Sequence, residues 1–216
     1  MEEINYGILM RKAKQDGDIN QQEKLCREIL ARSEATCRDF AIIIVNGVGK
    51  QKSEAWERFK AGNINRWWDL YFIISRRQGK LEDTACELLF ESPATAWHFC
   101  HIIVCADKKW HKRAWREATL RGMDIYDLFY LVGFADFKIA SLAWREILSM
   151  ELDFIDLRQA FCFADSSQLK REIAEYLLKH YAKDWVTLGY ISSYHPDETA
   201  RDEAKSRQDK LRISKN

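Results

Sequence analysis

The sequence predicts an all-α protein made of six to seven stacked helical hairpins. Three observations lead to this prediction: a motif that returns every 29–30 residues, apolar side chains at helical spacing, and few turn-forming residues. The chain has 216 residues but only two prolines and nine glycines, whereas an all-β sandwich needs many turns. Hydrophobic residues make up 47% and charged residues 31%, which indicates a folded chain.

The repeat is clearest in six two-residue motifs, each followed by a charged residue. They are Leu25-Cys26, Ala55-Trp56, Ala85-Cys86, Ala114-Trp115, Ala143-Trp144 and Ile173-Ala174, spaced 30, 30, 29, 29 and 30 residues apart. Around the fifth motif, Ala140, Ala143, Trp144, Ile147 and Leu148 fall at i, i+3, i+4, i+7 and i+8. This spacing gives one apolar face of an α-helix. We name this expected element the B helix of each unit.

A more apolar segment, which we name the A helix, precedes each B helix. These segments begin at Asp39, Asp69, His98, Asp127, Asp156 and Asp184, which are 28–30 residues apart. Polar residues at helical intervals, as in 156–163, favour a helix over a strand. Since one hairpin alone cannot bury its apolar side chains, neighbouring units must stack and cover the A helices.

The repeat predicts a single helical-repeat domain over residues 1–216. Its units are expected at roughly 4–34, 36–64, 65–93, 94–121, 122–150, 151–181 and 182–212. The charged stretch 196–216 has its acidic residues early and its basic residues late. This order suits the helix macrodipole and predicts a C-terminal capping helix.

The period and pattern of these units resemble the α-solenoid class, which includes HEAT-like and tetratricopeptide-like repeats. The resemblance covers nearly the whole chain, although the unit is shorter than is usual in either group and neither signature occurs. The resemblance implies a right-handed α-solenoid. Such a fold presents an extended surface whose exposed positions vary without harm to the core.

The sequence argues against a membrane or secreted protein. No apolar run approaches the roughly 20 residues that span a bilayer, and the N-terminus lacks the basic start and long apolar core of a secretory signal. The six cysteines are scattered through apolar segments without a CxxC pair, as expected of buried, reduced thiols. We therefore expect a cytoplasmic protein with no membrane partner.

The sequence offers no motif for catalysis. There is no GxSxG, Walker A, GxGxxG or HExxH pattern, each of which places reactive or phosphate-binding groups at a defined spacing. His98, His101 and Cys105 lie at i, i+3 and i+7, a spacing that suits zinc. The equivalent positions of the next unit, however, are Asp127, Tyr130 and Phe134. We therefore expect no catalytic residue, no metal site, no cofactor and no enzyme activity.

Two series of aspartates follow the repeat, and both are expected to stabilise helix starts. Asp39, Asp69, Asp127, Asp156 and Asp184 open the A helices, where a negative charge interacts favourably with the helix dipole. Asp107, Asp136 and Asp165 stand just before the B helices, where an aspartate serves as an N-cap. Asp165 also has Gln168 three residues later, which is the spacing of a capping box.

Basic residues gather at the turns between A and B helices and form a candidate interaction patch. Its members are Arg76, Arg77, Lys80, Lys108, Lys109, Trp110, Lys112 and Arg113. Cations at the start of a B helix oppose the helix dipole, so helix stability does not explain them. Basic residues with an aromatic between them suit a phosphate backbone and a stacked base. The alternative is a solvated edge in which Trp110 packs under lysine stems.

The other tryptophans are expected to serve packing. Trp56, Trp115 and Trp144 occupy the core register of the B helices. Trp67, Trp68 and Trp97 are expected to precede the A helices, where an apolar residue staples a helix start.

These residues and patterns point to two functions. The first is a non-catalytic protein-protein interaction or scaffold module, with a protein as its partner. The second is a nucleic-acid-binding solenoid that uses the basic edge, and it could extend to action on damaged DNA, as the resemblance to HEAT-like solenoids implies. The net charge of +1 counts against the second, because nucleic-acid binders usually carry a clear basic excess.

Overall fold

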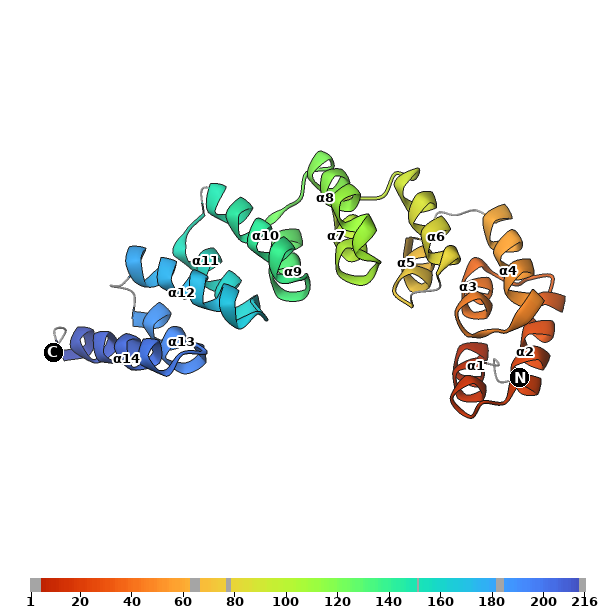
Figure 1. Cartoon of the computed structure of the whole chain (residues 1–216), viewed down its shortest axis with the longest axis horizontal. Coiled ribbons are helices and arrows are strands. Elements are labelled where there is room, and N and C mark those ends of the chain that lie inside the picture. Colours follow the sequence, from red (N-terminus) through yellow and green to blue (C-terminus); the bar gives the residue numbers. More distant parts are fainter. Residues whose placement is uncertain (1–4, 63–66, 77–78, 151, 182–184, 214–216) are drawn as a thin grey trace. The chain divides into compact units, whose positions relative to one another are not determined.

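The computed structural model describes residues 5–62, 67–76, 79–150, 152–181 and 185–213. These residues form fourteen α-helices and one short 3-10 helix, which hold 81% of them, and no strand (Figure 1). The helices are α1 (Tyr6–Gln15), α2 (Ile19–Ala31), α3 (Cys37–Asn46), α4 (Gly49–Ala61), α5 (Trp67–Ile74), α6 (Lys80–Phe90), α7 (Ala96–Cys105), η1 (Lys108–Trp110), α8 (His111–Leu120), α9 (Ile125–Phe134), α10 (Phe137–Ser149), α11 (Phe154–Phe163), α12 (Ser167–His180), α13 (Trp185–Tyr194) and α14 (Glu198–Ile213). The predicted all-α fold is confirmed.

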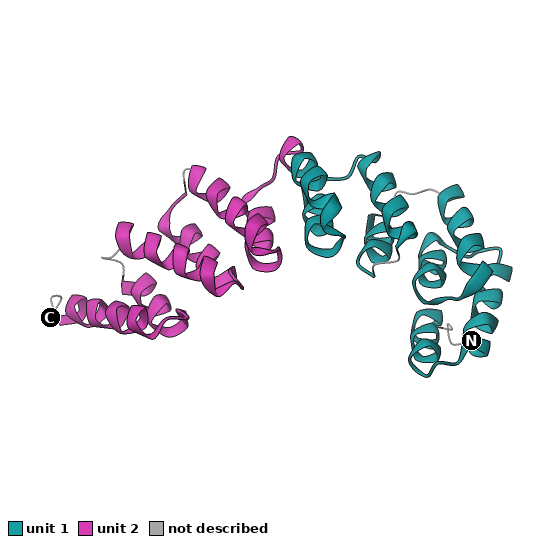
Figure 2. Cartoon of the chain, viewed as in Figure 1, with its two compact units in different colours: residues 1–118 teal, residues 119–216 magenta. Residues whose placement is uncertain are grey.

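The helices pack in neighbouring pairs within two compact units, residues 1–118 and 119–216 (Figure 2). In unit 1, α1 packs on α2, α3 on α4 and α5 on α6; in unit 2, α9 packs on α10, α11 on α12 and α13 on α14. Contacts also join alternate helices, such as α3 with α5, α9 with α11, α2 with α4 and α10 with α12. The odd-numbered helices are the predicted A helices and the even-numbered ones the B helices.

The two-residue motifs form the buried stripe of the B helices. They lie in α2, α4, α6, α8, α10 and α12, and all of their side chains are buried except Trp115, which is half-buried. The charged residue that follows each motif points away from the core: Arg27, Glu57, Arg116, Arg145 and Glu175 are exposed, and Glu87 is half-buried. The repeat in the sequence is therefore a repeat of packing.

Reciprocal caps start several of the A helices. The Thr36 side chain accepts a hydrogen bond from the Asp39 amide, and the Asp39 carboxylate accepts one from the Thr36 amide. Asp124 and Asp127 form the same capping box at the start of α9. In α7, His98 takes the place of the acid opposite Thr95. Asp184 lies outside the described residues.

The predicted caps of the B helices are confirmed at two positions and wrong at the third. Asp107 caps η1 by accepting from the Lys109 amide, and Asp136 caps α10 by accepting from the Ile139 amide. Asp165 does not cap α12, because the helix begins one residue later than expected. Ser166 is the N-cap there and accepts from the Leu169 amide.

The cysteines follow the expected pattern in part, because three are buried, Cys37 and Cys105 are half-buried and one is exposed. None of the six forms a disulfide, and Cys26, Cys86 and Cys100 are buried. Cys162 is exposed, so the prediction of a buried thiol is wrong for this residue. It stands near the end of α11, on a face that the helix does not bury.

No helix among the described residues is long and apolar enough to cross a membrane.

Packing inside the pairs should dominate stability, and two phenylalanines test this. Phe161 of α11 is 1% exposed, whereas Phe134 of α9 is 63% exposed. Truncation of a buried phenylalanine costs about 3–5 kcal/mol through lost burial and a cavity. We expect Phe161→Ala to lower the free energy of unfolding by about this amount in urea denaturation, and Phe134→Ala to change it by less than about 0.5 kcal/mol. Equal losses in both variants would contradict the prediction.

Candidate interaction surfaces

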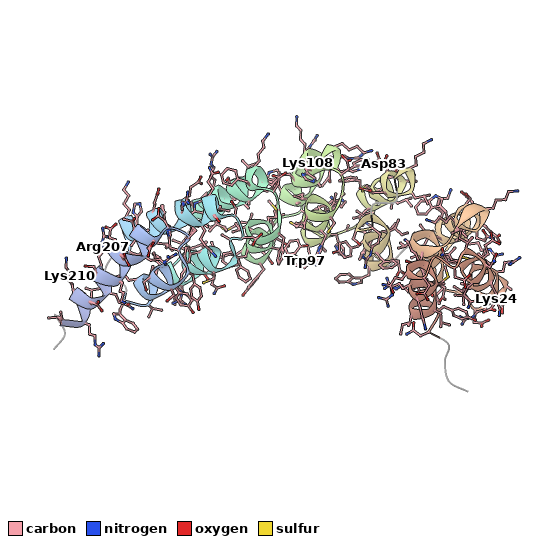
Figure 3. The ribbon with its side chains drawn as sticks, turned by 60° about the horizontal axis from the view of Figure 1, so that its bottom comes forward. Lys24, Asp83, Trp97, Lys108, Arg207 and Lys210 are labelled. Atoms are coloured by element: carbon pink, nitrogen blue, oxygen red, sulfur yellow. The ribbon has the colours of Figure 1, made fainter. Side chains whose placement is uncertain are left out.

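The densest part of the predicted basic patch lies at the start of α8. Lys108, Lys109 and Trp110 form η1, and Lys112 and Arg113 stand in the first turn of α8. All four cations are exposed, while Trp110 is half-buried. Figure 3 shows Lys108 on η1 and Asp83 on the neighbouring α6.

Acidic residues of α6 neutralise part of this cluster. The Lys109 Nζ lies 2.6 Å from Asp83 Oδ1, and the Trp110 Nε1–H donates to the same oxygen at 3.1 Å. Arg113 donates to Glu87 Oε2 at 2.6 Å. The backbone amide of Asp107 donates to the carboxylate of the buried Glu82 at 2.9 Å. Two of the four cations, Lys109 and Arg113, are therefore held by carboxylates of the preceding B helix.

Aromatic rings lie beneath these ion pairs. The Arg113 guanidinium stands 4.1 Å from the centroid of the buried Phe90 ring, and the Trp110 ring lies 5.7 Å from it. Phe90 in turn stacks on Phe99 of α7, with centroids 5.3 Å apart. Lys109, Trp110 and Arg113 thus join α6 to the next hairpin, which gives Trp110 a packing role.

The remaining members of the predicted patch do not share this arrangement. The Arg76 guanidinium stands over the ring of Phe72, 5.8 Å from its centroid, on the side of the A helices. Lys80 is exposed at the first position of α6. Arg77 lies outside the described residues.

The residues with metal-ligand spacing have other roles. His98 contacts Thr95 in the capping box of α7, and the Cys105 thiol lies 3.6 Å from the Tyr71 hydroxyl. The His101 ring packs between Tyr71 and Trp97, at centroid distances of 4.6 and 4.5 Å. Among the described residues, no three His, Cys, Asp or Glu side chains come together in a way that could hold a metal ion.

Two buried cysteines and the charged residues around one hollow are the other groups that could react or bind a ligand. Burial raises the pKa of the Cys26 and Cys86 thiols, which disfavours the nucleophilic thiolate. A hollow of about 580 Å³ is lined in part by Tyr6, Arg32 and Asp39. Its charged groups are already used, because Arg32 pairs with Glu34 at 3.0 Å and Asp39 belongs to the capping box of α3.

An exposed aromatic surface on the A helices was not predicted from the sequence. Trp67 and Trp68 lie inside the first turn of α5, and Trp97 inside that of α7, so the predicted staple before the helix is wrong. Trp68 is 60% exposed. It makes edge contacts with Tyr71, at a centroid distance of 6.2 Å, and with His101, at 6.4 Å. The spacing i, i+4, i+8 along each A helix would have revealed this second stripe.

The same stripe is most apolar in unit 2. Its side chains come from the positions i, i+4 and i+8 of three A helices. They are Tyr126, Tyr130 and Phe134 in α9, Ile155, Gln159 and Phe163 in α11, and Val186, Tyr190 and Tyr194 in α13. We name these nine residues the A face of unit 2. All are exposed except Tyr130 and Gln159, which are half-buried.

Charged residues are scarce around this face. The described helices α9, α11 and α13 contain only Asp127, Asp156 and Arg158 as charged residues. Asp127 is buried, and the Arg158 guanidinium lies over the Tyr190 ring at 4.9 Å. The B helices α10, α12 and α14 expose many charges instead. Unit 2 therefore has a charged side and an aromatic side.

The ion pair between α6 and η1 should make stability depend on pH. The hydrogen bond from Lys109, with a further one from Trp110, lowers the pKa of the Asp83 carboxyl. The folded protein thus binds this proton more weakly than the unfolded chain, so the stabilisation is complete above the ordinary aspartate pKa of about 3.9 and is lost as the pH falls below it. We expect Asp83→Asn to lower the urea midpoint at pH 7 and to match the wild type near pH 2.5, unlike the control Asp202→Asn. A difference in urea midpoint between Asp83→Asn and the wild type that persists near pH 2.5 would contradict a stabilising ion pair between Asp83 and Lys109.

The aromatic packing of His101 predicts a second pH dependence. Burial, with a smaller contribution from His98, lowers the pKa of His101 to about 4. Below the ordinary histidine pKa of about 6.5, the unfolded chain takes up a proton that the folded protein refuses, so stability should fall between about pH 6.5 and pH 4. His101→Phe keeps a ring and removes the titration. We expect the free energy of unfolding of this variant, from urea unfolding at several pH values, to fall less between about pH 6.5 and pH 4 than that of the wild type. An equal fall in both proteins would contradict the prediction.

Comparison with protein-family models, with curated proteins and with solved structures finds no match for this chain. Its function must therefore be inferred from its own residues and their geometry.

Proposed function

We propose that this protein is a non-catalytic protein-interaction module, a scaffold of the α-solenoid type. The observation that carries the proposal is the A face of unit 2, where large apolar side chains of three helices lie exposed beside one another. The proposal includes a right-handed stack of six to seven hairpins over one domain, working in the cytoplasm. In such a stack the core positions repeat while the exposed positions are available for a partner.

Exposure of this face has a free-energy cost that a partner would remove. Tyr126 is 71% exposed, and Phe134 and Tyr194 are each 63% exposed. Removing apolar surface from water is favourable by about 25 cal/mol per Å². Contiguous exposed apolar surface of this kind is a mark of interaction sites. Tyrosine and phenylalanine are also enriched in the buried centres of protein interfaces.

The charges elsewhere favour a protein partner over a nucleic acid. Lys109 and Arg113 already face Asp83 and Glu87, so their charge is partly neutralised before any ligand binds. The net charge of +1 adds no general attraction for phosphate. Lys112 and Arg116 remain exposed on α8, and they are what supports the alternative function, nucleic-acid binding along the basic edge.

The proposal is tested by removing two exposed aromatic rings of the A face. The variant carries Phe134→Ser and Phe163→Ser, and the matched control carries Ile213→Ser, which removes an exposed apolar side chain from α14. Immobilised proteins are used to capture partners from an extract of the native cells, followed by mass spectrometry. We expect the same protein to bind the wild type and the control and to be lost with the variant, since a few large side chains carry most of the free energy of binding at an interface.

Helical content by circular dichroism should be unchanged in the variant, since both side chains are exposed. Capture that does not differ between variant and wild type would contradict a role for this face. The alternative is checked by titrating labelled single- and double-stranded DNA and RNA at about 50 and 200 mM salt. Binding that weakens steeply with salt and is lost in a variant with Lys112→Gln and Arg116→Gln would establish the nucleic-acid function instead.

A further inference from the structure

The A face of unit 2 is a set of three ridges, one from each A helix. Rings contact one another along two of the ridges: Tyr130 lies 5.1 Å from Phe134 in α9, and Tyr190 lies 6.0 Å from Tyr194 in α13, measured between centroids. Phe163 of α11 stacks on Phe129 of α9 at 5.6 Å. The surface is therefore arranged before any partner arrives.

A glycine brings two of the ridges close together. A Cβ at Gly133 of α9 would lie 3.1 Å from the backbone oxygen of Phe163. Because glycine has no side chain, the end of α11 can approach the backbone of α9 here. Between α11 and α13, the Arg158 guanidinium over the Tyr190 ring makes the connection.

The dimensions of the face match one α-helix. Residues i to i+8 of a helix span about 12 Å along its axis, and packed helices lie about 8–10 Å apart. The helices α9 and α11 pack on each other, and Arg158 links α11 to Tyr190 of α13. With all three ridges at the spacing of packed helices, the face would cover about 12 Å in one direction and about 16–20 Å in the other. An α-helix with its side chains is about 10–12 Å wide, and about 11–13 of its residues would cross the three ridges. An extended peptide laid across the ridges is narrower than a helix and would cover about half of their ~12 Å length.

Carboxylates lie along one edge of the face. Asp124 and Asp153 precede α9 and α11 as their N-caps, and both are exposed. In each of them the Oδ1 atom accepts both backbone hydrogen bonds of the cap, at 2.8–2.9 Å in Asp124 and 2.8–3.1 Å in Asp153. The caps therefore use only one oxygen of each exposed carboxylate. Asp156, half-buried in the first turn of α11, stands at the same edge.

We propose that the A face of unit 2 binds an amphipathic α-helix of a partner protein, with an apolar stripe on the ridges and Lys or Arg along one flank. The inference rests on the proposed protein-interaction function and names the partner's chemistry. The apolar stripe of the partner covers the exposed aromatic rings. Its basic flank lies beside Asp124, Asp153 and Asp156. A phosphate-bearing ligand is disfavoured, because the only basic residue on the described helices of this face is Arg158.

The test uses fluorescent peptides of about 18 residues, long enough to cross the face as a helix. One peptide places Leu in a single helical stripe with Lys elsewhere. A second has the same stripe with Glu in place of Lys, and a third has the Leu/Lys composition shuffled so that no stripe forms. Binding to the whole chain is followed by fluorescence anisotropy. We expect the Leu/Lys helix to bind at least about tenfold more tightly than either of the others, and its binding to weaken with salt.

Variants assign the binding to this face. The Phe134→Ser and Phe163→Ser variant should lose at least about tenfold in affinity, while Ile213→Ser should keep the wild-type value. Asn caps helices as well as Asp does, so Asp124→Asn with Asp153→Asn removes two charges and keeps the caps. This variant should bind the Leu/Lys helix several-fold more weakly and lose its preference over the Leu/Glu helix. Asp136→Asn, the same change at the cap of α10, should have no effect.

The inference is overturned if the Leu/Lys helix does not bind, if the three peptides bind alike, or if the Phe variant binds as the wild type does. Saturable binding of phosphatidylserine vesicles or single-stranded DNA that the Phe variant abolishes would overturn it as well. Its failure is separable from that of the proposed function. If the Phe variant loses the captured protein while no helical peptide binds, the protein-interaction function is supported and the proposal of a helical partner is wrong.

Discussion

The structure depends on one constraint: a single helical hairpin cannot bury its own apolar side chains. Within each compact unit the A helices are apolar on more than one side, and they pack on their B helices and on neighbouring A helices, as α3 does on α4 and α5 and as α9 does on α10 and α11. This need explains the 29–30-residue period, because successive hairpins offer the same buried stripe. It also explains why Ala and Cys occupy so many motif positions, since small side chains let helices approach closely.

The polar contacts between hairpins follow from the same stacking. The Arg58 guanidinium of α4 donates to the Leu30 carbonyl at the end of α2, at 2.6 Å. Lys14 donates to the Val45 carbonyl in the last turn of α3, at 3.0 Å. In both cases a cation meets the negative end of a helix dipole in a neighbouring hairpin. The Lys109 and Arg113 pairs also join one hairpin to the next, which is why the densest basic cluster of the sequence is also a junction.

The A face of unit 2 is where the stacking leaves apolar side chains uncovered. Of the nine residues at i, i+4 and i+8 of α9, α11 and α13, all but Gln159 are aromatic or aliphatic, and seven are exposed. In unit 1 the equivalent positions of α5 and α7 combine Trp68 and Trp97 with Arg76 and the buried His101, so the surface there is more mixed. A partner helix with an apolar stripe would supply the missing layer in unit 2.

The sequence by itself determined the helical class, the positions of the A and B helices and the caps Asp107 and Asp136, because these depend on local spacing and on backbone amides within four residues. The caps of the A helices, such as Thr36 and Asp124, were found only in the structure. It did not determine which helix surface stays open. A residue such as Phe134 or Trp68 has the same composition signal whether a neighbour covers it or not, and only the packing of one helix pair on the next decides that. The role of Lys109 likewise depended on Asp83, 26 residues earlier, which no local pattern connects to it. Tertiary structure therefore added the aromatic face as a candidate site, and our proposal rests on it.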